Sequence, residues 1–143
     1  MIAAQPEACF DASIDVDLHV ESTAHTGERI VGGVTHGRMV LGDAVTFEAR
    51  HFGLRFRLTS KITEYERPRR FVDEMVEGPF KSVWHEHLFE QAGGGTRMTD
   101  TFRFSAPLGP LGVFAEQVFL KRHLHRVIAD RNAHIKRFAE KPR

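Results

Sequence analysis

The chain has 143 residues, with 20 Lys and Arg against 19 Asp and Glu, so its formal net charge is +1. That length is typical of one domain, which buries roughly 68–70% of its unfolded surface. The balanced charge argues against DNA binding, and the single cysteine excludes an internal disulfide bond. No apolar run approaches the ~18 residues that span a bilayer, and no signal peptide is visible, so we expect a single-domain cytoplasmic protein.

The aromatic composition is uneven, with twelve Phe but one Trp and one Tyr. Phe contributes apolar area without a polar group. This composition predicts either a strongly apolar core or an apolar cavity.

The first quarter of the chain is helix-like. Pro6 followed by Glu7 favours a helix start, because proline fits the first turn and an acid suits the helix dipole. The short helix that follows is mostly apolar and places Cys9 in the core. A second helical turn is predicted at about residues 15–21.

Alternation of apolar and polar residues then predicts antiparallel strands. They lie at 44–52, 54–64, 71–77, 80–90 and 96–104, with one or two more inside 29–41. Gly53, the Gly78-Pro79 pair and the triple glycine 93–95 mark turns between them. In 54–64, five non-apolar residues share one face, which indicates that this face of the sheet meets water.

A single long helix is predicted from residue 113 to about 140, since this segment contains neither Pro nor Gly until its end. At 1.5 Å per residue it is ~40 Å long. A curved sheet must cover its second face, and this helix is the only element large enough. We therefore predict an α+β fold in which six or seven strands curve around the long helix.

The apolar residues of this helix fall on two opposed faces, where a simple amphipathic helix has one. Either the first turns are buried all round, which we favour, or they form an exposed patch for ligand entry, dimerisation or membrane contact. One face holds Leu120, Leu124, Val127, Ile128, Ile135 and Phe138, and the other holds Leu111, Phe114, Ala115, Val118 and Phe119.

Four segments carry a resemblance to a known family. They are IAAQPEACFD at 2–11, ITEYERPRRF at 62–71, the stretch from FE at 89–90 to GGTRMTD at 94–100, and PLGPLG at 107–112. In this order they resemble the START-like (SRPBCC) superfamily, and most closely its bacterial polyketide cyclase/dehydrase-like members. The resemblance implies a helix-grip fold and a cavity for apolar or amphipathic molecules. Only five residues precede Pro6, so we expect a truncated, poorly paired first strand.

The most suggestive residues lie on one predicted strand, where Val83, His85, His87 and Phe89 share a face. Asp100 belongs to the inner set of the next strand. Two imidazoles and a carboxylate in an apolar cavity can orient a general base, hold a metal, or simply hydrogen-bond a ligand or each other. The last reading is the preferred one, and we assign neither a metal nor a cofactor.

A second carboxylate is predicted to point inward. Phe71 and Met75 share a strand face with Asp73, and a buried carboxylate must be paired or protonated. A partner role for Arg55 or Arg57 of the outer face is an equally good interpretation of Asp73.

Three functions remain open from the sequence. We prefer a module that binds a hydrophobic or amphipathic small molecule. The alternatives are a polyketide cyclase/dehydratase-like enzyme, with His85, His87 and Asp100 as catalytic residues, and a protein-interaction module without a small ligand. The predicted ligand-binding residues are Phe47, Phe56, Leu58, Phe71, Asp73, Met75, Phe89, Met98, Phe102, Phe114 and Val118.

The charge is divided unevenly along the chain. From residue 113 onward the net charge is +5, whereas the first 112 residues carry −4. Most of the helix charge is predicted to lie on a solvated face. The basic helix still suggests weak contact with an anionic partner, such as an acidic lipid or RNA.

Overall fold

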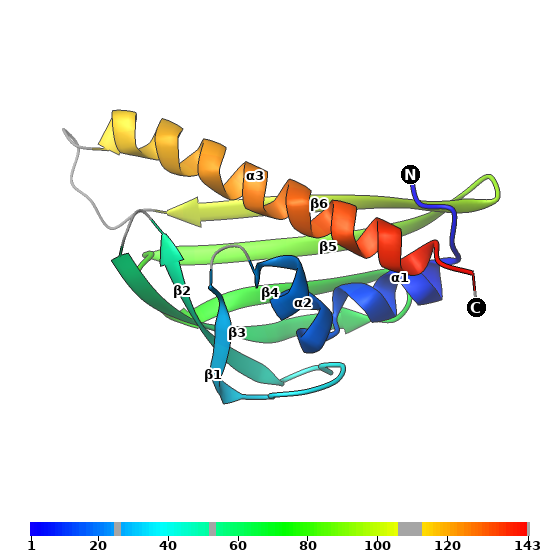
Figure 1. The fold of residues 1–143 in the computed structure, drawn as a ribbon, viewed down its shortest axis with the longest axis horizontal. Helices are drawn as coiled ribbons and strands as arrows, with labels where there is room; N and C mark the ends of the chain where they lie inside the picture. The colour runs from blue at the N-terminus through cyan, green and yellow to red at the C-terminus, as the bar shows by residue number, and fades with distance from the viewer. Residues whose placement is uncertain (25–26, 52–53, 106–112, 143) are drawn as a thin grey trace.

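The computed structural model describes residues 1–24, 27–51, 54–105 and 113–142, without the side chains of residues 51 and 113–120. Two short helices come first, then a six-stranded antiparallel sheet, then a long helix (Figure 1). Each strand pairs with its neighbours in sequence, in the order β1-β2-β3-β4-β5-β6. The elements are α1 (Pro6–Ser13), α2 (Val16–Ser22), β1 (Arg29–Gly33), β2 (Ala44–His51), β3 (Leu54–Glu66), β4 (Arg70–Glu77), β5 (Ser82–Ala92), β6 (Gly95–Ser105) and α3 (Val113–Ala139).

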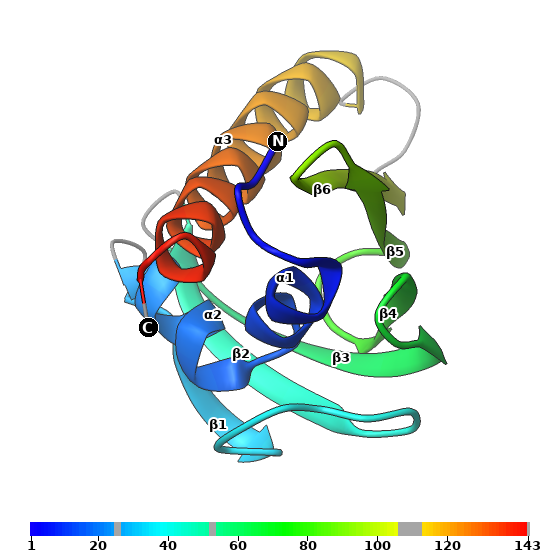
Figure 2. The ribbon, with the colours of Figure 1, turned by 90° about the vertical axis from the view of Figure 1, so that its right-hand side faces the viewer.

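The sheet curves around α1, and α3 lies along the opening between its two edges (Figure 2). Within the described residues, α3 packs mainly against α1 and α2 rather than directly on the strands. This is the predicted α+β helix-grip architecture, with six strands and two short N-terminal helices.

One predicted strand segment is wrong. Residues 34–41 form a loop whose only ladder contact among the described residues is an isolated bridge between Asp15 and Arg38. The break comes at Gly33, which has a φ of +73°. A Cβ there would lie 2.2 Å from the carbonyl oxygen of Ala44, so only glycine allows the chain to turn so close to β2.

The N-terminal residues pair with the start of β6. Ile2 and Thr96 exchange two backbone hydrogen bonds of 2.8 Å as an isolated bridge, which agrees with the expected short, poorly paired first strand. The backbone N–H of Ala3 donates to Glu140 at 2.7 Å. The two ends of the chain therefore meet beside α1.

The core is densest where α1 enters the curved sheet. The ring of Phe10 makes edge-to-face contacts with Tyr65, Phe71 and Phe89, with centroid distances of 5.3–5.5 Å. Cys9 is fully buried beside it, as predicted. Each aromatic pair contributes about 0.5–1.5 kcal/mol beyond area burial, so this end of the molecule is filled and stable.

The outer face of the sheet carries an ion-pair group centred on Glu48. Its two carboxylate oxygens accept 2.8 Å hydrogen bonds from Arg29 and Arg57, and Arg55 lies 4.0 Å away. Arg55 and Arg57 therefore serve Glu48, and their predicted pairing with Asp73 is wrong. The hydrogen bonds from Arg57 and then Arg29 lower the pKa of Glu48 from 4.5 to about 2.

Replacing Glu48 with Gln should therefore destabilise the protein in a pH-dependent way. Because the folded-state pKa is depressed, the stabilisation is present above about 4.5 and is lost as the pH falls toward 2. We expect the wild type and the variant to differ most at neutral pH and to converge in acid. Urea unfolding across this range measures the difference, with Glu66→Gln as an exposed control; a constant difference would contradict the prediction.

The described part of α3 corrects two helix predictions. Ile135 is buried as expected, but Phe138 is 47% exposed. Arg131, predicted within a solvated charge run, is 6% exposed. The opposed face lies outside the described residues or side chains, including Leu111, Phe114, Ala115, Val118 and Phe119, as does Leu120. No helix in the described ranges is long and apolar enough to cross a membrane.

Candidate functional site

The site begins with two histidines on the inner face of β5. Strand alternation buries Val83, His85, His87 and Phe89, while Trp84 between them stays half-exposed. His85 is 7% exposed and His87 only 1%. Their rings lie 3.9 Å apart between centroids, and the ring of His87 stacks on Phe71 at 4.1 Å. Two imidazoles are thus held in contact inside the sheet.

A carboxylate flanks this pair on each side. In the strand register, Asp73 of β4 stands opposite His85, and Asp100 of β6 stands opposite His87. The hydrogen bonds run diagonally instead: Nε2 of His87 lies 2.7 Å from Asp73, and Nε2 of His85 lies 2.8 Å from Asp100. We name these four residues the His–Asp cluster. Strand alternation predicts that all four face inward, and the structure brings them together.

Three further side chains hold the cluster in place. Ser60 of β3 donates to Asp73 at 3.1 Å, and Asn132 of α3 donates to Asp100 at 2.5 Å. Arg131 lies 3.9 Å from Asp100 and donates to the backbone oxygen of Ser13 at 2.8 Å. Sequence reasoning missed these three as site residues. Strand alternation places Ser60 on the inner face but does not indicate a partner for it. Arg131 and Asn132 lie about thirty positions from Asp100 in the sequence, so no local pattern predicts that they contact it.

The two carboxylates are ionised. Burial alone would raise their pKa values, but hydrogen bonds to the histidines outweigh it. The hydrogen bond from His87 holds the pKa of Asp73 well below its usual range, and so does the positive charge that His85 carries at low pH. The hydrogen bond from His85 does the same for the pKa of Asp100.

The two histidines shift in opposite directions. Burial would lower the pKa of His87, but its contacts with Asp100 and Asp73 raise it above 6.5. Burial and the neighbouring charge of His87 lower the pKa of His85 below 6.5. At neutral pH the cluster therefore holds two carboxylates and a neutral His85, while its surroundings favour the protonated form of His87. Arg131 places a positive charge 3.9 Å from Asp100, which partly offsets the two carboxylates.

One nitrogen of each histidine makes no hydrogen bond with the described residues. A carboxylate only accepts, so the Nε2 of neutral His85 carries the proton that faces Asp100, and its Nδ1 keeps a lone pair. That Nδ1 lies 3.9 Å from Asp73. The Nδ1 of His87 is buried and lies 3.0 Å from Asp100, but without hydrogen-bond geometry. The cluster can therefore accept a proton or a hydrogen bond at His85.

The predicted ligand-binding side chains divide into three groups. Phe71 and Phe89 belong to the buried core, and Phe47 and Met98 pack against it. Four others are half-buried and lie outside that core: Phe56, Leu58, Met75 and Phe102. The side chains of Phe114 and Val118 are outside the described part. The His–Asp cluster contacts both kinds of residue: the ring of His87 stacks on Phe71 of the core, and the ring of His85 lies 5.2 Å from that of the half-buried Phe102.

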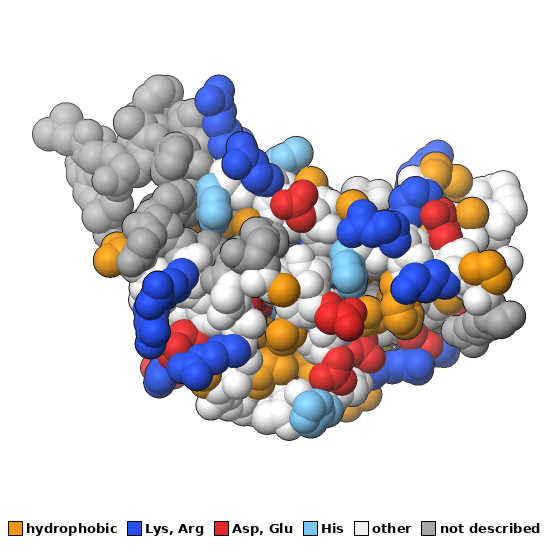
Figure 3. Space-filling view, in the orientation of Figure 1, with side chains coloured by type: hydrophobic (Ala, Val, Ile, Leu, Met, Phe, Trp, Pro, Cys, Tyr) orange, Lys and Arg blue, Asp and Glu red, His pale blue; other side chains and the backbone are white. Residues whose placement is uncertain are grey.

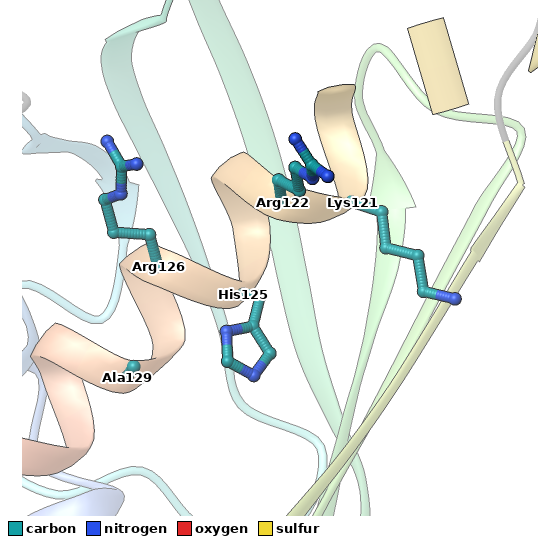
Figure 4. A pocket seen from close by; sticks show the side chains of 5 residues that line it. All are labelled: Lys121, Arg122, His125, Arg126 and Ala129. Carbon is teal, nitrogen blue, oxygen red and sulfur yellow. The ribbon is translucent and has the colours of Figure 1, made fainter. Parts of the chain in front are cut away.

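A hollow of about 580 Å³ lies elsewhere, along exposed residues of α3. Figure 4 shows the side chains that line it: Lys121, Arg122, His125, Arg126 and Ala129. Lys and Arg side chains follow α3 over this face of the molecule (Figure 3). The contact of this basic helix with an anionic partner stays a prediction from the sequence.

The helix-grip fold is that of a START-like (SRPBCC) protein, as the sequence resemblance implied. The chain belongs to the family described as "Polyketide cyclase / dehydrase and lipid transport", whose model matches residues 1–140. A search of curated proteins found no match.

Solved structures show the same fold at low identity. TTHA0849 from Thermus thermophilus has a TM-score of 0.72 and 16% identity, covering 94% of this chain and 91% of that one. Major latex-like protein 151 from Panax ginseng has a TM-score of 0.65 and 12% identity, covering 98% and 93%. The AHSA1-like protein from Aeromonas hydrophila has a TM-score of 0.64 and 18% identity, covering 99% and 92%. These similarities establish the architecture.

Proposed function

We propose that this protein binds an amphipathic small molecule on the concave face of the sheet. The apolar part of this small molecule contacts Leu58, Met75 and Phe102, and the polar end of the molecule donates a hydrogen bond to Nδ1 of His85. The family includes lipid transport in its description, which agrees with a ligand of this class.

One observation carries the proposal. Leu58, Met75 and Phe102 point inward by strand alternation, yet each is only half-buried and none belongs to the packed core. Apolar area in water costs about 25 cal/mol per Å², so a ligand that covers these side chains gains affinity from them. The ring of Phe102 also contacts His85, at 5.2 Å, so apolar and polar contacts adjoin.

The two faces of β4 provide a matched test. Met75 faces inward and is half-buried, whereas its neighbour Val76 is 57% exposed. We expect Met75→Glu to weaken binding of an apolar fluorescent probe, such as a naphthalene sulfonate, by more than 10-fold, because it puts a charge into the apolar contact. Val76→Glu adds the same charge on the other face and should change affinity by less than about 2-fold.

The same experiment shows how the proposal fails. Equal effects of the two substitutions would place the probe elsewhere. Native mass spectrometry of the purified protein, followed by lipid extraction, provides a second readout. A protein that carries no ligand and binds no apolar probe would refute the proposed function.

A catalytic role is the second candidate, favoured by the state of His85. Asp100 fixes its tautomer, and its lowered pKa keeps the ring neutral with a lone pair at Nδ1, as a general base requires. We propose proton abstraction in a cyclisation or dehydration of a polyketide-like substrate as this alternative. Binding that survives His85→Gln while turnover is lost would favour the enzyme over the carrier.

A further inference from the structure

The His–Asp cluster presents three metal-type donors toward one another. One ligand atom each from Asp73, His85 and His87 lies within 4.8 Å of the other two. Nε2 of His87 is 2.7 Å from Oδ2 of Asp73, and Nδ1 of His85 is 3.9 Å from that same oxygen. Asp73 lies on β4, and His85 and His87 lie two positions apart on the neighbouring strand β5. The paired backbone therefore holds the three side chains in place.

We propose that these three side chains bind a divalent first-row transition-metal cation, with Zn²⁺ as the best match. Two imidazoles and one carboxylate form a donor set that Zn²⁺ favours, with a further position left for water or a ligand group. This inference stands on the cluster alone and does not depend on the amphipathic ligand. With a cation bound, Nδ1 of His85 is a metal ligand, and the polar end of a bound molecule would take the further position on the cation instead of that nitrogen.

The surroundings of the three donors match those of a metal centre. A histidine ligand commonly directs its second nitrogen to a carboxylate, which fixes the ring. Here the second nitrogens of both histidines face the same oxygen of Asp100, at 2.8 Å for His85 and 3.0 Å for His87. A cation on Nε2 of His87 would leave the proton on Nδ1, and a small ring rotation would then direct it to Asp100. This accounts for a buried nitrogen that otherwise has no hydrogen bond.

The remaining oxygens of both carboxylates are also occupied. Ser60 donates to Oδ1 of Asp73, which leaves Oδ2 free to face the cation. Asn132 donates to Oδ2 of Asp100, which leaves Oδ1 for the histidines. In each carboxylate, one oxygen thus faces the proposed metal site or its histidine ligands, and the other accepts a hydrogen bond from Ser60 or Asn132.

Binding exchanges a proton for the cation. In the metal-free protein, Nε2 of His87 carries a proton that bonds Asp73. On binding, this N–H bond breaks and a metal–nitrogen bond forms; the proton passes to Nδ1 of the same ring, or to solvent where Nδ1 already carries one. The two donor atoms must also separate from 2.7 Å to about 3.3 Å, the spacing expected for ligands about 2.0 Å from a tetrahedral cation. Nδ1 of His85 must in turn approach Oδ2 of Asp73, from which it lies 3.9 Å away.

The test uses the full chain, stripped with a chelator and titrated with Zn²⁺ or Co²⁺. We expect one equivalent to bind, measured by calorimetry, with the visible absorption of low-coordinate Co²⁺. Asp73→Asn and His87→Gln should each lower the affinity at least 100-fold. His36→Gln is the matched control, because the side chain of His36 is 85% exposed and should not affect the affinity.

One further variant tests the carboxylate behind the ligands. Asp100→Asn keeps all three ligands and removes only the carboxylate behind them, so the affinity should fall about 10- to 100-fold. Circular dichroism shows whether each variant is folded. No binding by the wild type, several equivalents of equal affinity, or an affinity unchanged by His87→Gln and Asp100→Asn would overturn the metal site.

Discussion

Replacing Asp100 with Asn should lower the free energy of unfolding by about 3–5 kcal/mol in metal-free protein, the usual cost of removing one partner from a buried ion pair. The side chain of Asp100 is 7% exposed and faces His85, His87 and Arg131. Without its charge, Arg131 remains buried with no carboxylate paired with it among the described residues, and His87 keeps Asp73 alone. Urea unfolding followed by circular dichroism measures the loss.

Two comparisons separate this charge effect from a general loss of packing. Glu66→Gln removes an exposed partner of Arg69 and should cost less than about 1 kcal/mol. Arg131→Met in the Asp100→Asn background should recover part of the lost stability, since the unpaired cation is removed. Additive effects of the two substitutions would show that the charges do not balance each other.

In the metal-free protein, the two histidines should make the free energy of unfolding change with pH in opposite directions. The pKa of His87 is raised, so its contribution is complete below about 6.5 and is lost as the pH rises through the folded-state value. The pKa of His85 is lowered, so its neutral form costs stability as the pH falls below about 6.5 toward the folded-state value. Each effect is limited to about 1.4 kcal/mol per pH unit, the work of one proton.

Single substitutions separate the two slopes. His87→Gln should remove the decline of stability above pH 6.5, whereas His85→Gln should remove the decline below it. Unfolding at half-unit pH steps, with a chelator present, resolves both, and His36→Gln should leave the curve unchanged. The same slope change in both variants would contradict the opposite pKa shifts of the two rings.

Strand alternation accounts for how much of the site the sequence could predict. A period of two places His85 and His87 on the face of Phe89, and the same rule places Asp73 with Phe71. The partners could not be predicted, because the hydrogen bonds run diagonally across strands and depend on register and side-chain direction. Turn signals set the strand ends to within a few residues.

The helix residues show where local patterns are insufficient. Arg131 lies in a basic segment and its burial depends on the oxygen of Ser13, which comes from the opposite end of the chain. The loop at 34–41 resembles a strand in sequence because Val34, Met39 and Val40 have strand-like character. The chain turns at Gly33, which has a positive φ and lies too close to Ala44 for any side chain, and β1 ends there. Composition does not reveal this turn.

In the part of the chain that the structure describes, α3 packs mainly on α1 and α2. Leu58, Met75 and Phe102 lie on strands and take no part in that helix packing. If these three residues contact the ligand as proposed, substitutions there would alter ligand preference while the described helix contacts are kept. The scaffold is suited to redesign, and to evolutionary divergence, by changes on a few strand positions while its frame is kept.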